Sequence, residues 1–446
     1  MLVTAGSAFV RQELLMRRFG KILAFVLTAA LFAGLFAGCG AGDNHPEDDR
    51  ITITIWTIAT EGDAFHKPFT EAIAEYNRSQ DKYKVVMETF ENDQYKAKLP
   101  IQVKANQLPD IFYTWAGGFS EAFVASGKVL ELDSFYEKYR DELPESKLAA
   151  RYDGKLYGIP YVTPISVVFY NKKAFAAAGI ESTPETYDEW LACCEKLKEA
   201  GIIPIGNAAK SDNAWVLAML YDALMLKTVG PGKLAKVLTD KEGSYNSTAF
   251  LEGTEAFRKI ISLGYMDPRA GMINNDQALE KLYRGESAMY VTGSWLACQF
   301  YDPKNCENPE DFDFFPVPVI NEANASATDF MGGSADTLMV NRYSEHPEEA
   351  AEIAFLLARS VSRRSYLSGA GTPAWNVDYD TSAVLPLPKK IAETCEGATS
   401  FTLWFDTLMV ADDKDEYLKN LTDLYNGTID AQQFVRNMAE KLSQQR

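Results

Sequence analysis

The chain has 446 residues and a formal net charge of -18, with 62 acidic residues, 44 basic residues and only three histidines. Its apolar fraction of 47% is ample for packed cores and excludes a largely disordered chain. The excess of acid argues against a nucleic-acid-binding protein, because few basic residues are left to neutralise phosphates. The scarcity of histidine argues against most His-dependent catalysis and against His-rich metal sites.

The first part of the chain predicts a secretory leader. Arg17, Arg18 and Lys21 form a cationic start, and residues 22–36 form an apolar run that ends at small residues. This run is too short for a comfortable membrane span, which needs about 20 residues. We expect translation to start at Met16.

The end of this leader predicts a site of lipid attachment. Residues 35–39 (LFAGC) resemble a bacterial lipobox, although Phe36 stands where leucine is usual. We expect residues 1–39 to be the lipoprotein signal peptide, with Cys39 acylated as the mature N-terminus. Residues 40–50 are small, polar and acidic, which is typical of a flexible tether. Ordinary secretion with a chance cysteine is the alternative.

The first predicted elements of the mature chain alternate between strand and helix. Residues 51–56 alternate isoleucine with threonine and predict a strand, which a helix over 65–76 and a second strand over 83–90 follow. Residues 108–115 predict a short buried strand. The dipeptide Asp153-Gly154 predicts a tight hairpin.

The same alternation continues further along the chain. Residues 165–170 predict a strand, and residues 172–178 predict a helix that Gly179 ends. Thr186 and Glu189 form a capping box at the start of another helix. Alternating strands and helices are typical of α/β units, for which we expect mostly parallel sheets.

The cysteines give little functional information. Five follow Cys39 and none forms a CxxC motif, which gives no support to a zinc ribbon or a thioredoxin-like centre. Cys298 and Cys306 are close enough in sequence for a disulfide, but spacing alone does not show that their geometry permits one. Cys193 and Cys194 lie in a helical pattern, where we expect buried small side chains.

Five motifs in a fixed order carry a family resemblance. They are Pro109-Asp110-Ile111, Gly158-Ile159-Pro160, residues 170–175 (YNKKAF) with Gly179, residues 183–190 (TPETYDEW) and residues 284–295 (RGESAMYVTGSW). Each is weak alone. Together, behind a lipobox, they resemble the extracellular solute-binding proteins of family 1, the maltose-binding-protein-like receptors of ABC sugar importers. The similarity extends from about Ile51 to the C-terminus.

This resemblance implies an α/β, two-lobed periplasmic-binding-protein-like fold of type II. Each lobe would be a mostly parallel sheet flanked by helices, with a hinge between the lobes. The N-terminal lobe would hold residues 51–163 and 317–358, and the C-terminal lobe would hold residues 164–316 and 359–446. The chain would cross between the lobes near Pro164, near 316–318 and around 358–362.

The implied function is that of a substrate-binding lipoprotein. It would capture a sugar or short oligosaccharide in the interlobe cleft and deliver it to the transmembrane subunits of an ABC permease. We expect a monomer without a cofactor, held at the extracellular face of a bacterial cell membrane by the lipid on Cys39. The alternatives are a receptor for glycerol phosphate or a polyamine, and a surface sensor or adhesin.

An enzyme is disfavoured by the motifs. A secreted glycosidase would use two carboxylates about 5–10 Å apart, but no motif singles out such a pair. The G-x-S-x-G elbow and the glycine-rich phosphate loop are also missing from the sequence.

A sugar receptor needs flat aromatic side chains and polar groups that satisfy the sugar hydroxyls. The aromatic candidates for ligand binding are Trp115, Trp215, Trp295, Trp375 and Trp404. Trp115 ends the predicted strand at 108–115, on the edge where ligands bind in open α/β sheets. The resemblance places Trp295, Trp375 and Trp404 at the cleft, whereas Trp190 is expected in the core and packing is favoured for Trp56.

The polar candidates lie in loops and near the predicted crossings. They are Thr60, Glu61, Tyr161, Thr163, Asn213, Ser294 and Asp336. An ordinary acidic residue at a helix start is the alternative for Glu61. Simple turn chemistry is the alternative for Asp336.

Overall fold

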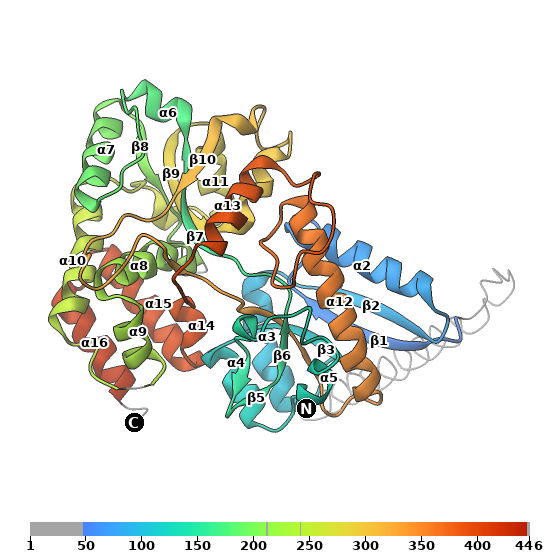
Figure 1. Ribbon diagram of the computed structural model, residues 1–446. Helices are drawn as coiled ribbons and strands as arrows, with labels where there is room; N and C mark the ends of the chain where they lie inside the picture. Colours follow the sequence, from blue (N-terminus) through green and yellow to red (C-terminus); the bar gives the residue numbers. More distant parts are fainter. Residues whose placement is uncertain (1–47, 211–212, 241, 444–446) are drawn as a thin grey trace, which may run out of the picture. The chain divides into compact units, whose positions relative to one another are not determined.

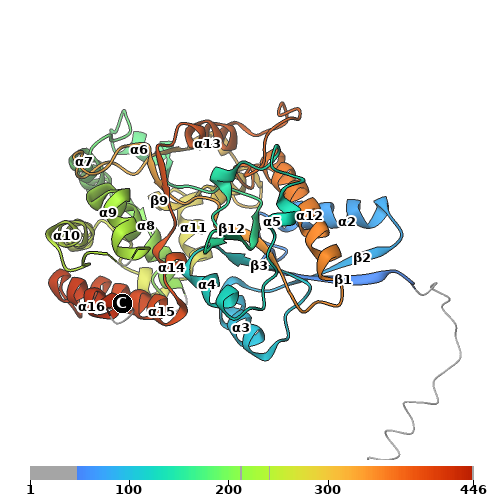
Figure 2. The same cartoon turned by 60° about the horizontal axis from the view of Figure 1, so that its bottom comes forward.

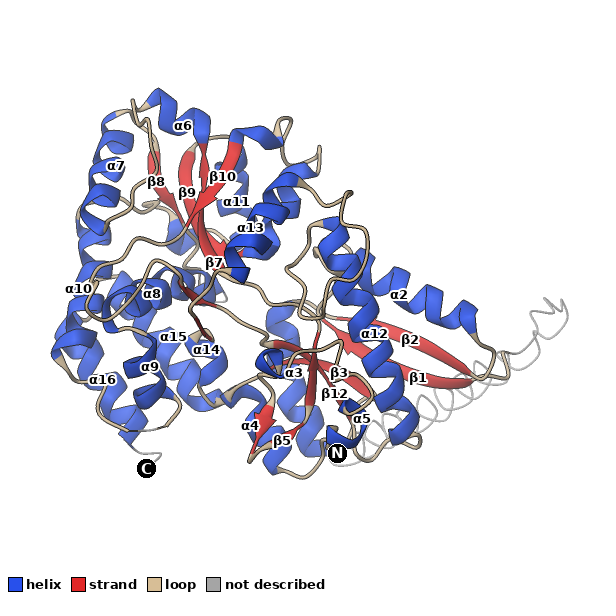
Figure 3. Ribbon diagram, viewed as in Figure 1, coloured by secondary structure: helices blue, strands red, loops and turns tan. Residues whose placement is uncertain are grey.

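The computed structural model describes residues 48–210, 213–240 and 242–443, and all structural statements below concern these residues. Cys39 and the predicted leader lie outside them. From Arg50 onward the chain forms one compact unit. It contains two separate larger β-sheets, each with helices packed around it (Figure 1; Figure 3).

The two larger sheets use strands from distant parts of the sequence. The first sheet, in spatial order, contains β2 (Tyr83–Thr89), β1 (Ile51–Thr57), β3 (Ile111–Trp115), β12 (Asp336–Val340) and β6 (Gly158–Pro160). The second contains β10 (Phe312–Phe315), β7 (Ser166–Asn171), β9 (Ser287–Gly293) and β8 (Ile203–Gly206). Two small pairs are β11 (Asp329–Met331) with β13 (Ser400–Thr402) and β4 (Arg151–Tyr152) with β5 (Lys155–Leu156).

Both larger sheets are mixed, where the sequence predicts mostly parallel ones. Strand β1 is parallel to β2 and β3, but β12 is antiparallel to β3 and β6. In the second sheet β8 and β9 are parallel, while β7 is antiparallel to both of its neighbours. Strand–helix alternation fixes direction only for strands joined by a local crossover. Strand β12 reaches the first sheet from a remote segment, so the local pattern does not specify its direction.

Several local predictions are confirmed. Strand β1 buries Ile53 and Ile55 on one face, as its alternating pattern requires. The hairpin between β4 and β5 has positive φ at Asp153 (50°) and Gly154 (78°), which suits an Asp-Gly turn. The capping box of Thr186 opens the next helix.

The helices cover the sheets on both sides. They are α2 (His66–Ser79), α3 (Asn92–Ala105), α4 (Gly118–Ala125), α5 (Asp133–Tyr136), α6 (Lys172–Ala177), α7 (Tyr187–Glu199), α8 (Ala214–Val229), α9 (Pro231–Leu238), α10 (Thr248–Ser262), α11 (Asn275–Tyr283), α12 (Pro347–Ser368), α13 (Pro386–Glu396), α14 (Phe405–Leu408), α15 (Ala411–Tyr425) and α16 (Ala431–Ser443). Helices α2 and α12 lie side by side next to the first sheet (Figure 2). Among the described helices none is long and apolar enough to cross a membrane.

The buried cores divide the chain differently from the predicted lobe boundaries. Helix α12 runs unbroken through residues 358–362, and its buried face belongs to the core of the first sheet. Val317 and Met331 pack in a core of the second sheet, although the predicted N-terminal lobe includes both. The resemblance implied a crossing near residues 316–318, but the chain stays with the second core as far as Met331 and enters the first sheet at Asp336.

Three segments that connect the two sheets lie side by side. The Thr163 amide donates to the carbonyl of Thr372 at 2.8 Å. The Gly333 amide donates to the carbonyl of Pro164 at 2.9 Å. Ile165 and Gly332 also form an isolated antiparallel bridge. The predicted crossing near Pro164 thus has partners near residues 332–334 and 372.

A buried lysine stabilises the second half of the molecule. Lys227 is only 2% exposed, and its Nζ donates to the carbonyls of Ser326 (2.8 Å), Ala327 (3.1 Å) and Asp329 (2.7 Å). Burial lowers the pKa of Lys227 to about 8, so the ammonium group is still mostly protonated at pH 7.

We expect Lys227→Met to lower the free energy of unfolding by about 2–4 kcal/mol, because three carbonyls, that of Asp329 buried and those of Ser326 and Ala327 partly buried, lose a charged donor. Urea denaturation followed by circular dichroism measures this effect. The control is Lys236→Met, since Lys236 is exposed on α9. Equal stability of the two variants would show that the Lys227 contacts contribute nothing.

Candidate functional site

A cavity of about 1100 Å³ is lined by residues from both halves of the molecule, the half around the first sheet and the half around the second sheet. One wall comes from the carboxyl ends of the parallel strands β1, β2 and β3. These ends supply the loop 58–65, Glu91 with Asn92, and Trp115. Ligands of open α/β sheets bind at this edge, because the loops that follow parallel strands converge there.

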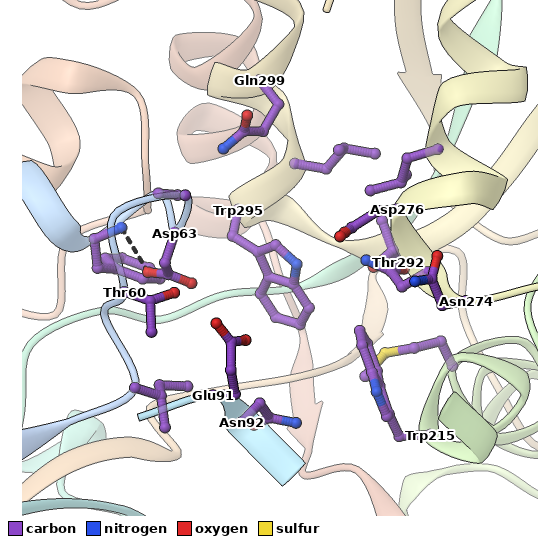
Figure 4. Close-up of a pocket in the computed structure, with 18 of the residues that line it drawn as sticks. Thr60, Asp63, Glu91, Asn92, Trp215, Asn274, Asp276, Thr292, Trp295 and Gln299 are labelled. Atoms are coloured by element: carbon purple, nitrogen blue, oxygen red, sulfur yellow. Dashed lines mark hydrogen bonds between the residues drawn. The ribbon is translucent and has the colours of Figure 1, made fainter. Parts of the chain in front are cut away.

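The opposite wall comes from the second sheet and its helices. Thr292 is the second-last residue of β9 and Trp295 follows the strand, while Asn274 and Asp276 lie at the start of α11. In Figure 4 the Trp295 indole lies between Asp63 on one side and Asp276 on the other. The cavity thus contains an aromatic ring, that of Trp295, with a polar group on each side of it.

Trp295 and Trp215 are the tryptophans with the most accessible rings in this cavity. Both are half-buried and line it from the second half of the molecule. A Cβ atom at Gly293 would overlap the Trp295 indole, so the ring folds back over the end of β9 where only glycine leaves room. Trp404 packs against this ring, with its ring centroid 5.6 Å from that of Trp295, and its Nε1 donates to Ser166 Oγ at 2.9 Å.

Trp115 lines the cavity but is only 8% exposed. Its ring packs edge-on against Tyr113 and Phe119, and Lys96 Nζ lies 4.8 Å from its centroid. Little of the ring is left for a ligand. Trp115 therefore acts mainly in the packing of the wall.

Four of the polar candidates also line the cavity: Thr60, Glu61, Tyr161 and Asp336. The Asp336 carboxylate accepts a hydrogen bond from the Tyr113 hydroxyl. Burial raises the pKa of Asp336 to about 6, although Tyr113 and the nearby Lys96 act in the opposite direction. Asp336 is therefore still mostly ionised at pH 7, but it takes up a proton at a higher pH than an ordinary carboxyl does.

Asp63 is the main acidic residue that the sequence reasoning missed. Burial raises its pKa to about 6, its hydrogen bond from the Phe65 amide (2.8 Å) lowers it, and the charge of Asp336 raises it further. Asp63 follows the candidate Glu61 by two residues. The rule that ligand groups lie after parallel strands would have found both Asp63 and Glu91.

Trp375 and Thr163 do not line this cavity, contrary to their prediction as cleft residues. The Trp375 Nε1 donates to the Pro160 carbonyl at 2.8 Å, and its ring packs edge-on against Phe355 in the first core. Thr163 Oγ1 lies 2.8 Å from Ser334 Oγ. Their polar atoms are already used between crossing segments, which explains why neither faces the cavity.

Ser294 and Asn213 also lie outside the cavity lining. Ser294 Oγ accepts from the Ile165 amide at 3.3 Å, next to the first crossing segment. Asn213 Oδ1 accepts from the Asn275 amide at 2.6 Å. Asn213 thus fixes the start of α11, whose first residues do line the cavity, and acts on the site through that helix.

An ion pair connects the two halves of the molecule across the cavity lining. Lys96 on α3 lies 3.1 Å from the carboxylate of Asp406 on α14. Next to it, Gly117 packs against the backbone of α14, where a Cβ atom would lie 2.6 Å from the Thr407 carbonyl oxygen. Neither contact has a local sequence signal, because each joins residues about 290–310 positions apart.

The described part of the chain offers no cluster of three or more His, Cys, Asp or Glu side chains suited to a metal ion. Cys298 and Cys306 are both free thiols, so the disulfide that their spacing allowed is not formed. Cys194 is buried in its helix, as predicted, and Cys193 is partly buried.

Comparisons with known proteins agree with this architecture. Residues 58–359 match the family described as Bacterial extracellular solute-binding protein. An uncharacterized ABC transporter extracellular-binding protein of Pyrococcus horikoshii is 25% identical over 353 residues, covering 77% of this chain and 79% of its own. The arabinooligosaccharide-binding protein of Bacillus subtilis is 26% identical over 405 residues, covering 88% of each chain.

One solved structure is similar in both fold and sequence. It comes from work on xylan utilization by the thermophilic bacterium Caldanaerobius polysaccharolyticus, with a TM-score of 0.83 and 29% identity, and the match covers 88% of this chain and 100% of that chain. A chitin oligosaccharide binding protein has the same fold, with a TM-score of 0.81 and 22% identity over 89% of this chain and 99% of its own.

Proposed function

Because the chain belongs to the bacterial extracellular solute-binding proteins, we propose that it is the receptor through which an ABC importer takes up a sugar or short oligosaccharide. Proteins of this family bind solutes outside the cytoplasm and are not enzymes. The ligand would lie in the cavity described above, and the receptor would deliver it from there to the permease subunits.

The cavity lining is the observation that carries this proposal. Four tryptophans, of which Trp215 and Trp295 have the most accessible rings, line one space of about 1100 Å³ together with amide and carboxylate side chains. Ligand pockets usually measure about 300–1000 Å³, so the space is large enough for more than one sugar ring. Flat rings suit the C–H faces of sugars, and fixed polar groups suit their hydroxyls. The relatives named for arabinooligosaccharide and chitin oligosaccharide binding support the same ligand class.

The proposal includes closure of two lobes about the three connecting segments near Pro164, residues 332–334 and Thr372. Their mutual hydrogen bonds would keep the segments together while their ends rotate. Ligand contacts to both walls would favour the closed state, since a ligand stabilises the state to which it binds more tightly. We expect the receptor to act as a monomer.

A thermal-shift screen over neutral mono- and oligosaccharides tests the proposed ligand class. The cognate sugar should raise the melting temperature in a concentration-dependent way, because it binds only the folded state. It should be recovered unchanged after incubation. A stabilising response to glycerol phosphate or spermidine, with none to sugars, would contradict the proposal.

Gly293→Ala tests whether the orientation of Trp295 matters. The added methyl group displaces the indole from the end of β9, and we expect affinity for the sugar to fall about three- to tenfold, since an aromatic contact contributes about 0.5–1.5 kcal/mol. Calorimetric titration measures the affinity, and tryptophan fluorescence reports the displaced ring. Gly271→Ala is the control, because its Cβ position is open. Unchanged affinity and fluorescence in Gly293→Ala would show that the ring position is not constrained.

The lipid anchor on Cys39 is a further part of the proposal, supported by the lipobox-like sequence. We expect Cys39→Ser to move the protein from the membrane fraction to the soluble fraction of the expressing bacterium, because the acylated residue is lost. Fractionation followed by immunoblotting measures this change, and Cys306→Ser is the control. Membrane retention of Cys39→Ser would contradict lipid anchoring.

A further inference from the structure

The cavity carries an excess of negative charge that its own cations do not balance. Seven carboxylates and three basic side chains line it. Lys96 is paired with Asp406 at 3.1 Å, and Arg284 is paired with Glu280 at 2.7 Å. The third base, Lys304, is exposed.

Five lining carboxylates have no ion pair with any Lys or Arg in the described part of the chain. They are Glu61, Asp63, Glu91, Asp276 and Asp336. They occupy both walls, since Asp276 comes from the first turn of α11 and the others lie in or next to loops of the first sheet. Figure 4 shows the Glu91 side chain directed toward Trp295 of the opposite wall.

We propose that the cavity selects oligosaccharides that carry no acidic group, so that sugar phosphates and uronic-acid-containing chains are excluded. The inference rests on the proposed sugar-binding function and narrows its ligand class. A carboxylate accepts hydrogen bonds from sugar hydroxyls and suits an uncharged polyol. The same carboxylates repel an anionic ligand, and the repulsion is stronger in a partly closed cavity than in open water.

Matched ligand pairs test this selectivity. Xylotetraose is compared with its glucuronic-acid-substituted form, cellotetraose with cellotetraose oxidised to a carboxylate at one C6 position, and galactose with galactose 6-phosphate. For each neutral member that binds, we expect the acidic counterpart to bind at least about tenfold more weakly in calorimetric titrations at pH 7.

A charge variant identifies the cause of the selectivity. Asp63→Asn combined with Glu91→Gln removes two negative charges of the cavity lining that repel each other. This double variant should reduce the ratio of neutral-sugar to acidic-sugar affinity at least threefold. Glu255→Gln is the control for net charge, because Glu255 lies exposed on α10, and it should leave the ratio unchanged.

The outcomes separate this inference from the function on which it rests. Equal binding of a neutral sugar and its acidic counterpart overturns the selectivity and leaves the sugar receptor intact. Preference for the acidic member does the same. A ratio that the double variant leaves unchanged overturns the role of the carboxylates. Failure of every neutral sugar in the screen overturns the proposed function, and the inference with it.

Discussion

Replacing Trp295 with alanine is expected to weaken oligosaccharide binding about 30-fold, since loss of a central aromatic anchor costs about 2 kcal/mol. The indole is half-buried, lines the cavity and lies between polar groups of both walls. Its main aromatic neighbour is Trp404, which the protein buries by other contacts. The variant should therefore remain folded. Calorimetric titration measures the affinity, and thermal unfolding checks the fold.

Two further variants make this result specific to the Trp295 ring. Trp56→Ala also removes a half-buried indole, but Trp56 packs edge-on against Phe90 and does not line the cavity, so affinity should change less than threefold. Trp295→Phe keeps an aromatic face and should recover part of the affinity. Wild-type affinity in Trp295→Ala would rule out the ring as a sugar platform.

The local elements could be predicted because their signals are short-range. Strand β1 follows an alternation of isoleucine and threonine, the hairpin follows Asp153-Gly154, and the capping box follows Thr186 and Glu189. Each pattern acts through neighbours within a few residues. The mixed direction of the sheets could not be predicted, because β12 pairs with β3 across more than 200 residues.

The candidate site was predicted in part for the same reason. Trp115, which ends β3, could be placed at the ligand edge by a general rule, and Thr60 and Glu61 follow β1 at the same edge. The orientation of a tryptophan could not be predicted. Trp375 and Trp404 are both 5% exposed or less and both use their Nε1 internally, yet only Trp404 touches the cavity.

Asp63 and Asp336 should couple sugar binding to pH. Burial raises the pKa of each carboxyl to about 6 from an ordinary value of 3.8, and the two also interact with each other. The pKa of Asp63 is also affected by the Phe65 amide and by the charges of His66 and Glu91.

Two groups on other strands and helices face Asp336. The Tyr113 hydroxyl donates to it, and the charge of Lys96 acts on it, and both favour the ionised form. The pKa of Asp336 is nevertheless raised, so the effect of burial is larger than that of Tyr113 and Lys96 together.

The raised pKa values imply that the two carboxyls lower the folding stability of the unliganded protein at neutral pH. Between about pH 4 and pH 6 the folded state holds these protons more tightly than the unfolded state does, so the contribution of the two carboxyls to stability falls as pH rises through this window. Asp336→Asn keeps an oxygen that can accept from Tyr113 and removes the charge. It should raise the free energy of unfolding by on the order of 1–2 kcal/mol at pH 7 and by almost nothing at pH 4.

A bound sugar should offset this loss of stability. Sugar hydroxyls that donate to Asp63 and Asp336 favour the ionised carboxylates, so binding should lower both pKa values and release protons near pH 6. The affinity of the wild-type protein should then rise about tenfold from pH 5 to pH 7. Calorimetric titration at pH 6 in two buffers of different ionisation enthalpy measures the protons released.

The variants decide whether these two carboxyls are responsible. In Asp63→Asn combined with Asp336→Asn, proton release should disappear and affinity should become nearly independent of pH between 5 and 7, whereas Glu255→Gln should behave like the wild type. Greater stability together with weaker binding in the double variant would mean that the wild-type protein keeps a destabilising pair of carboxyls because the ligand needs it. Proton release that persists in the double variant would assign the coupling to other groups.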